Sequence, residues 1–109
     1  MNELNRKLAE WAGFKNIRFG KDYILMTGRF NKVEEITPFT QSLDACFKWL
    51  VPKLDNLVLR YRHYNAGHMG YEARTLKVYD DDEYDTFLGI DKNPALALCL
   101  VIEKLIDKE

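Results

Sequence analysis

Both histidines of the chain, His63 and His68, lie in one short stretch, RYRHYNAGHMGYEAR, and histidine is a common metal ligand. Strand-forming residues fill positions 57–64, and the Asn-Ala-Gly sequence at 65–67 is typical of a three-residue hairpin loop. This loop would place Tyr64 opposite His68. Because side chains alternate between the faces of a strand, His63 and His68 would then point to opposite sides of the hairpin. The spacing therefore predicts no shared metal site, and we expect no metal or other cofactor.

The same register separates the apolar side chains of the hairpin from its basic ones. The apolar face would carry Leu57, Leu59, Tyr61 and His63 opposite Thr75, Ala73, Tyr71 and Met69. The polar face would carry Val58, Arg60, Arg62 and Tyr64 opposite Arg74, Glu72, Gly70 and His68. Guanidinium groups hold phosphate and aromatic rings stack on bases, so this face is a candidate anion-binding site made of Arg60, Arg62, Arg74, Tyr64 and His68. The alternative is a solvent-exposed face on which Arg60 pairs with Glu72.

Other residues that could perform chemistry lack the spacing that the chemistry requires. Cys46 and Cys99 each fall inside an apolar helical pattern, without a CxxC motif, where a thiol acts as a small hydrophobic group. The acidic run at 80–85 fails the calcium-loop pattern, which needs glycine where Asp85 stands and glutamate where Asp91 stands. We therefore expect a solvated acidic turn, no catalytic residues and no enzyme activity.

Three helices are expected to position these residues. The first spans residues 2–12 and ends at Gly13, and the last begins after Asn93, with Pro94 in its first turn. The middle helix is capped by Thr40 or Ser42, and Pro52 bends or ends its last turn. Its apolar stripe comprises Leu43, Cys46, Phe47, Leu50, Val51 and Leu54.

Some apolar side chains lie off the helical stripes that would face the core. Trp49 lies off the stripe of the middle helix, and Leu96 and Leu100 lie on the far side of the last helix, in line with Glu103 and Asp107. These three residues form a candidate interface with a second subunit or a partner. The alternative is that the first helix covers them.

The strands are expected at residues 23–27, in the hairpin at 57–75 and at residues 84–90. After Thr75 the alternation changes phase, which predicts a bulge or a strand end. Residues 29–39 are interpreted as a connection. The order of elements predicts a single α+β domain over residues 1–109, with three helices packed on a small antiparallel sheet in helix/sheet/helix layers.

Composition narrows the possible partners. The chain has 109 residues, and its 16 basic and 17 acidic residues almost balance, so general attraction to nucleic acid or to an anionic membrane is not expected. A low net charge is compatible with self-association. Apolar runs are too short to span a bilayer, and two cysteines without a signal peptide favour the cytoplasm.

Two segments together resemble a known family. TPFTQSLDACFKWLVPKL and NPALALCLVIEKLID, on either side of a short antiparallel sheet, are similar to the small phage and prophage proteins of the phage ABA sandwich domain family. The resemblance covers about the C-terminal two-thirds of the chain. It implies a layered helix–sheet–helix fold, a location in the host bacterial cytoplasm and no assigned activity, and no catalytic residues can be carried over.

The expected function is therefore that of a small phage or prophage accessory protein that acts by binding and forms a homo-oligomer, with a host protein or a small anion as a further partner. The alternative is a module that captures an anionic, nucleotide-like small molecule with Arg60, Arg62 and Arg74.

Overall fold

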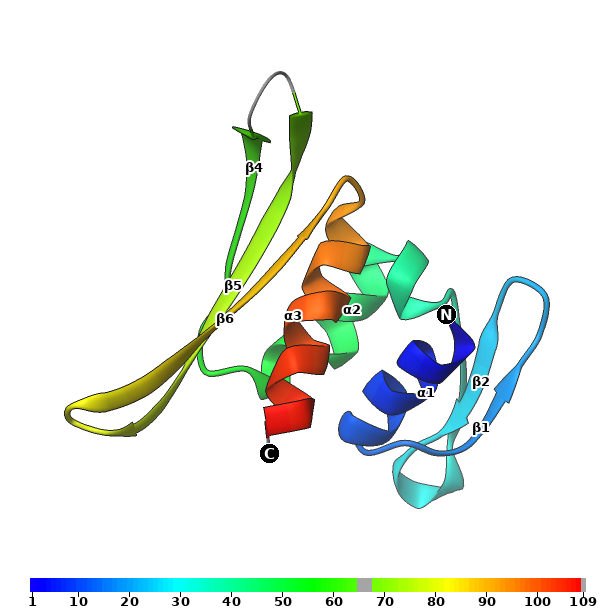
Figure 1. Cartoon of the computed structure of the whole chain (residues 1–109). Coiled ribbons are helices and arrows are strands. Elements are labelled where there is room, and N and C mark those ends of the chain that lie inside the picture. Colours follow the sequence, from blue (N-terminus) through cyan, green and yellow to red (C-terminus); the bar gives the residue numbers. More distant parts are fainter. Residues whose placement is uncertain (65–67, 109) are drawn as a thin grey trace.

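The structure, a computed structural model, describes residues 1–64 and 68–108, apart from the side chains of residues 63–68 (Figure 1). The helices are α1 (Asn2–Trp11), α2 (Leu43–Trp49) and α3 (Pro94–Lys108), with short 3-10 turns η1 (Arg29–Asn31), η2 (Phe39–Gln41) and η3 (Val51–Lys53). The strands are β1 (Lys15–Phe19), β2 (Ile24–Thr27), β3 (Val33–Ile36), β4 (Val58–Tyr64), β5 (His68–Asp80) and β6 (Glu83–Asp91). The predicted α+β class is confirmed.

The strands form two three-stranded antiparallel sheets, β1-β2-β3 and β4-β5-β6, and the helices lie between them (Figure 1). The sequence predicts a single sheet with helices on both of its faces. The structure instead has a layer of helices with one sheet on each side. The reason is that each sheet has one apolar row, and both rows face inward. Ile24 and Met26 of one sheet are fully buried, as is Ala73 of the other, and Phe87 is nearly so.

The sheet β4-β5-β6 has the predicted register. Tyr64 pairs with His68, Arg60 with Glu72 and Leu59 with Ala73. The bulge or strand end expected after Thr75 does not occur there, because β5 continues and its pairing with β6 first shifts between Val78 and Asp80. The change in alternation after Thr75 instead marks the point where β5 begins to carry apolar side chains, Leu76 and Val78, on the outer face of the sheet, which points away from the helices.

The sheet β1-β2-β3 is larger than expected, since only the strand at residues 23–27 is predicted. Residues 29–39, interpreted as a connection, contain β3, which pairs with β2. Its Val-Glu-Glu-Ile sequence carries two charged residues that disfavour strands, but an edge strand tolerates them because one side of it faces solvent.

Helix α2 is shorter than its apolar stripe. Ser42 caps it by accepting a hydrogen bond from the backbone N–H of Ala45 at 3.1 Å, as predicted. The helix ends at Trp49, and η3, which contains Pro52, follows. The stripe also fails at Phe47, which is 46% exposed, whereas Cys46 and Leu50 of the same stripe are fully buried.

Helix α3 makes the closest contact between layers. A side chain at Gly89 of β6 would place its Cβ 2.2 Å from the carbonyl oxygen of Ala97 and 2.8 Å from the backbone nitrogen of Val101. Both atoms belong to the helix backbone, so the strand approaches α3 to a distance that only glycine allows. Asn93 caps this helix as predicted, accepting a hydrogen bond from the backbone N–H of Ala95 at 2.9 Å.

A buried polar network joins α1 to the start of α3. Asn5, which is 3% exposed, donates to the Oγ1 of Thr40 at 3.2 Å and accepts from the backbone N–H of Thr40 at 3.3 Å. Asn93 donates to the carbonyl oxygen of Thr40 at 3.0 Å. Thr40 of η2 therefore connects the two helices.

None of the helices in the described residues is long and apolar enough to cross a membrane.

Replacing Gly89 with alanine should destabilise the protein by about 1–3 kcal/mol, because the added methyl group forces β6 away from α3. Urea unfolding followed by circular dichroism measures the loss. Thr86→Ala, at an exposed position of the same strand, should change the free energy of unfolding by less than about 0.5 kcal/mol. Equal effects of the two substitutions would contradict the close contact.

Candidate functional site

The predicted arginine patch exists, and its centre is a buried carboxylate. Glu72 is 5% exposed and accepts a hydrogen bond from the Nε of Arg60 at 2.6 Å. Arg62 approaches the other carboxylate oxygen at 3.4 Å, and Arg74 lies 3.8 Å from the first. The three arginine side chains are 43–47% exposed. The cluster therefore carries two more positive charges than negative ones, on the outer face of β4-β5-β6.

Two opposing effects set the pKa of Glu72. Burial by itself raises the pKa of this carboxyl group, because removing a charge from water is unfavourable. The hydrogen bond from Arg60 and the charges of Arg60, Arg62 and Arg74 lower it and outweigh the burial. The pKa of Glu72 lies below its ordinary value, and the carboxylate is ionised at neutral pH.

Tyr64 and His68, the other two residues of the predicted site, are backbone partners where β4 and β5 meet the hairpin loop. Their side chains, like that of His63, lie outside the described residues. The structure therefore brings together the three arginines of the candidate site around Glu72 and leaves its aromatic part as a prediction.

A second site lies on the other side of the helical layer. It is a cavity of about 660 Å³ between the N-terminal sheet and the end of α2. Its lining residues come from distant parts of the sequence: Ala12, Gly13, Phe14, Gly28, Arg29, Phe30, Lys32, Glu34, Trp49 and Lys53. We call it the aromatic groove.

Aromatic rings form the floor of the aromatic groove and cations form its rim. The rings of Phe14 and Trp49 meet edge to face, with centroids 5.0 Å apart and planes at 87°. The ammonium group of Lys53 lies over the ring of the neighbouring Trp11, 4.8 Å from its centroid, and donates to the carbonyl oxygen of Trp11. Lys32 pairs with Glu34 at 3.3 Å. Three cationic residues thus line the groove against one acidic residue.

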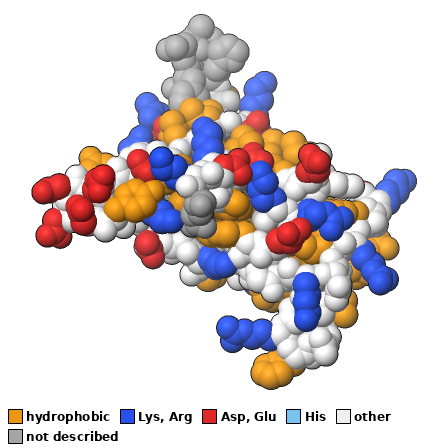
Figure 2. Space-filling view, turned by 60° about the horizontal axis from the view of Figure 1, so that its bottom comes forward, with side chains coloured by type: hydrophobic (Ala, Val, Ile, Leu, Met, Phe, Trp, Pro, Cys, Tyr) orange, Lys and Arg blue, Asp and Glu red, His pale blue; other side chains and the backbone are white. Residues whose placement is uncertain are grey.

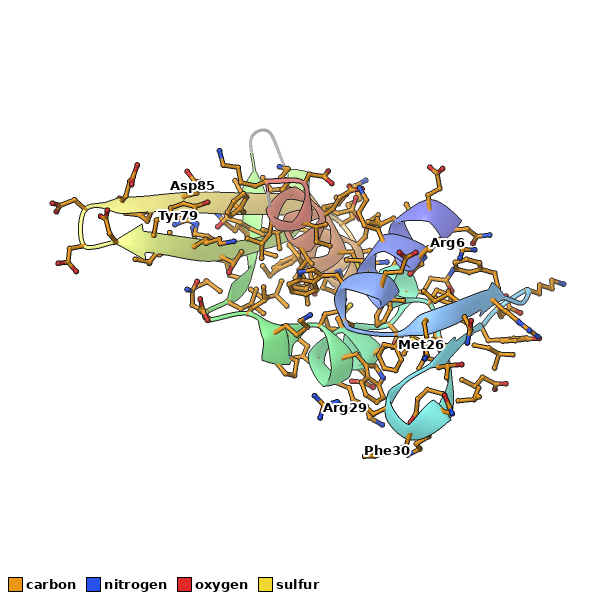
Figure 3. All side chains as sticks on the ribbon, turned by 90° about the horizontal axis from the view of Figure 1, so that it is seen from below. Arg6, Met26, Arg29, Phe30, Tyr79 and Asp85 are labelled. Atoms are coloured by element: carbon orange, nitrogen blue, oxygen red, sulfur yellow. The ribbon has the colours of Figure 1, made fainter. Side chains whose placement is uncertain are left out.

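One aromatic residue of the groove is fully exposed. Phe30 is 100% accessible and has a φ of +59° in the loop between β2 and β3. A bulky residue in the left-handed region is unfavourable by about 1–3 kcal/mol, and here no burial of the ring offsets it. Figure 3 shows Phe30 and Arg29 together at the outer end of this loop.

The candidate interface residues are all partly buried. Trp49 packs against Phe14 and lines the aromatic groove. Leu96 and Leu100 pack partly against the core. Lys7 of α1 pairs with Glu103 at 3.2 Å and with Asp107 at 3.0 Å, so α1 runs along the side of α3 that carries the two leucines. Their role in a subunit interface stays a prediction.

The two cysteines meet in the core, which their separate helical patterns do not predict. Their sulfur atoms are 3.8 Å apart, both side chains are fully buried, and the thiol of Cys46 donates to the carbonyl oxygen of Phe39 at 3.2 Å. The hydrogen bond with Cys46, together with burial, raises the pKa of the Cys99 thiol. This thiol stays protonated at neutral pH and is not a nucleophile.

No group of three or more potential metal ligands occurs among the described residues. At the turn between β5 and β6, Asp80, Asp81, Asp82 and Glu83 are all exposed. Figure 2 shows acidic side chains gathered at one end of the molecule, and the Asp80 carboxylate accepts a hydrogen bond from the backbone N–H of Asp82 at 2.9 Å. The solvated acidic turn agrees with the sequence prediction.

Comparison of the chain with protein-family models, with curated protein sequences and with solved structures gives no match in any of the three. The resemblance to the phage ABA sandwich domain proteins therefore stays a prediction.

Most of the aromatic groove is missing from the candidate residues predicted from the sequence. Of its lining residues only Trp49 is predicted, and as an interface residue. The one local signal is the sequence Gly-Arg-Phe-Asn-Lys at 28–32, which places an aromatic residue between two cations in a loop that begins with glycine. Phe14 and Lys53 carry no such signal, because only the tertiary fold brings them beside this loop.

Glu72→Gln should destabilise the protein by about 1–3 kcal/mol at pH 7, because the amide no longer neutralises the three guanidinium groups. The difference from the unchanged protein should shrink as the pH falls through the lowered pKa of Glu72, where the carboxyl group becomes protonated. Urea unfolding at several pH values measures this. Glu35→Gln, at an exposed site in the other sheet, is the control, and a difference that persists unchanged at low pH would contradict the assigned charge state.

Neither thiol should react with a thiol-specific disulfide reagent while the protein is folded, because both are buried and the thiol of Cys99 resists deprotonation. Both should react after unfolding in urea. Absorbance of the released thiolate counts the reacted groups, and fast reaction of the native protein would show that a thiol is accessible.

Proposed function

We propose that the protein acts by binding, without catalysing a reaction, and that its ligand is a small anion carrying an aromatic ring, such as a nucleotide. The observation that carries the proposal is the aromatic groove, where the Phe14–Trp49 pair adjoins a rim that includes Arg29, Lys32 and Lys53. Bases stack on aromatic side chains, and phosphate groups pair with arginine and lysine.

The dimensions of the groove support a ligand of this class. A volume of about 660 Å³ falls within the range of roughly 300–1,000 Å³ that is typical of small-molecule sites. The exposed ring of Phe30 stands at the mouth of the groove and could cover a base bound there. Arg29 beside it would contact the phosphate.

The arginine patch is the second candidate site for a ligand of this class. Its excess positive charge favours the binding of an anion. Glu72 already occupies the centre of the patch, however, and each arginine lies within 4 Å of its carboxylate. An incoming anion would compete with Glu72 for the same guanidinium groups. The aromatic groove has no comparable internal anion at its centre, since Glu34 pairs with Lys32 at the rim.

The biological setting follows from the resemblance alone. We propose a phage or prophage accessory protein in the host bacterial cytoplasm, for which binding rather than catalysis is the mode of action. Self-association and a host protein partner belong to the same proposal.

Binding can be tested by thermal unfolding and calorimetry with adenosine and guanosine mono- and diphosphates. We expect a saturable rise in Tm that decreases with added salt, because phosphate contacts are screened. Arg29→Ala should weaken binding about tenfold, the effect of losing one charge-assisted hydrogen bond. Phe30→Ala should weaken binding without lowering Tm, because the ring is fully exposed.

Lys21→Ala is the matched control for Arg29→Ala, since it removes one exposed positive charge from the other loop of the same sheet. If Arg62→Ala abolishes binding and Arg29→Ala does not, the ligand occupies the arginine patch instead. Absence of a Tm shift with every nucleotide would overturn the proposal.

A further inference from the structure

The outer face of β4-β5-β6 has three zones along the strands. The arginine patch lies at one end, on β4 and on the first half of β5. Exposed apolar side chains follow in the middle, namely Leu76 (37% exposed), Val78 (64%) and Tyr84 (63%), while Val58 (52%) and Ile90 (46%) lie within the patch rows. The acidic turn at 80–83 forms the other end (Figure 2). The strand register places Val78 opposite Tyr84, whereas Val58 lies opposite Arg74 and Ile90 opposite Glu72.

The chain also exposes more surface than a compact monomer of its size. Its accessible surface is 7185 Å², whereas about 6,300 Å² is expected for a mass of 12.8 kDa. The excess of roughly 900 Å² is close to the ~800 Å² that each partner contributes to a standard interface.

We propose that two copies of the chain pack through this outer face, related by a two-fold axis that crosses the strands near Leu76. Such an axis reverses the strand direction, so positions equally distant from Leu76 come together. The acidic turn of each copy then meets the arginine patch of the other, and the Leu76 side chains of the two copies meet at the axis. An axis parallel to the strands would instead place arginines on arginines and acidic groups on acidic groups, which is unfavourable.

The arrangement explains the surplus charge of the arginine patch. The three guanidinium groups and Glu72 together carry a net charge of +2, and this charge faces the acidic turn of the second copy. Arg62 pairs with Gly70, six residues before Leu76, and the acidic turn begins at Asp80, four residues after it, so the two-fold axis brings the turn of one copy toward the Arg62 end of the other. The interface is a two-sheet sandwich, in which side chains of facing sheets interdigitate. It is independent of the aromatic groove, whose lining residues lie elsewhere.

Sedimentation velocity at micromolar to 100 µM protein should give twice the chain mass of 12.8 kDa, with dissociation promoted by salt. Leu76→Asp, at an exposed position on the axis, should give a folded monomer, because it places two like charges against each other in the dimer. Arg62→Glu and Asp82→Lys should each weaken the dimer at least about tenfold by placing like charges together.

An equimolar mixture of the Arg62→Glu and Asp82→Lys chains supplies the decisive result. In the mixed dimer the reversed patch meets the reversed turn, and the unchanged patch meets the unchanged turn, so dimerisation should recover. Arg18→Glu and Glu35→Lys, exposed positions in the other sheet with the same changes in charge, should leave the dimer intact. Circular dichroism confirms that each variant folds.

Three outcomes would overturn the proposal. A strict monomer at 100 µM excludes the interface, and a dimer that survives Leu76→Asp places the interface on another face. Failure of the mixed chains to associate, with both variants folded and monomeric, excludes the two-fold pairing of patch and turn.

Discussion

The close approach of β6 to α3 at Gly89 is the constraint on which the rest of the structure depends. Without a side chain at Gly89, the strand can lie against the helix backbone at Ala97 and Val101, and the helix then covers the inner face of β4-β5-β6. The opposite side of α3 is left for α1, and Thr40 joins the two helices through Asn5 and Asn93. A single helix therefore serves as the core of both halves of the molecule.

One-sided packing of this sheet has a consequence for its outer face. Because α3 takes the apolar row of Ala73 and Phe87, the alternate row faces away from the helices, and it contains Glu72 and the arginines. Glu72 is nearly inaccessible although it is outside the core, since the arginine side chains themselves cover it. Its ionisation is maintained by those guanidinium groups, whose charges outweigh the desolvation of the carboxylate.

The sequence predicts local features of the fold well and the assembly of the candidate sites poorly. The register of β4 and β5 follows from the loop at 65–67 and the alternation of side chains, and the cap at Asn93 follows from its position before Pro94. The strand at residues 33–36 escapes prediction because an edge strand needs no apolar pattern. The meeting of Cys46 with Cys99 and of Phe14 with Trp49 depends on how helices and sheets pack, which no local spacing encodes.

The two candidate surfaces lie on opposite sides of the helical layer, and this separates their possible functions. The aromatic groove is formed by the N-terminal sheet and the end of α2, whereas the arginine patch is on the face of β4-β5-β6 that points away from α3 (Figure 1). Contacts across one surface therefore leave the other accessible. A dimer joined through the outer face would carry two aromatic grooves, both open to solvent, and ligand binding in them would not require the subunits to separate. In the two proposals the arginine patch around Glu72 serves assembly, and the exposed ring of Phe30 serves recognition.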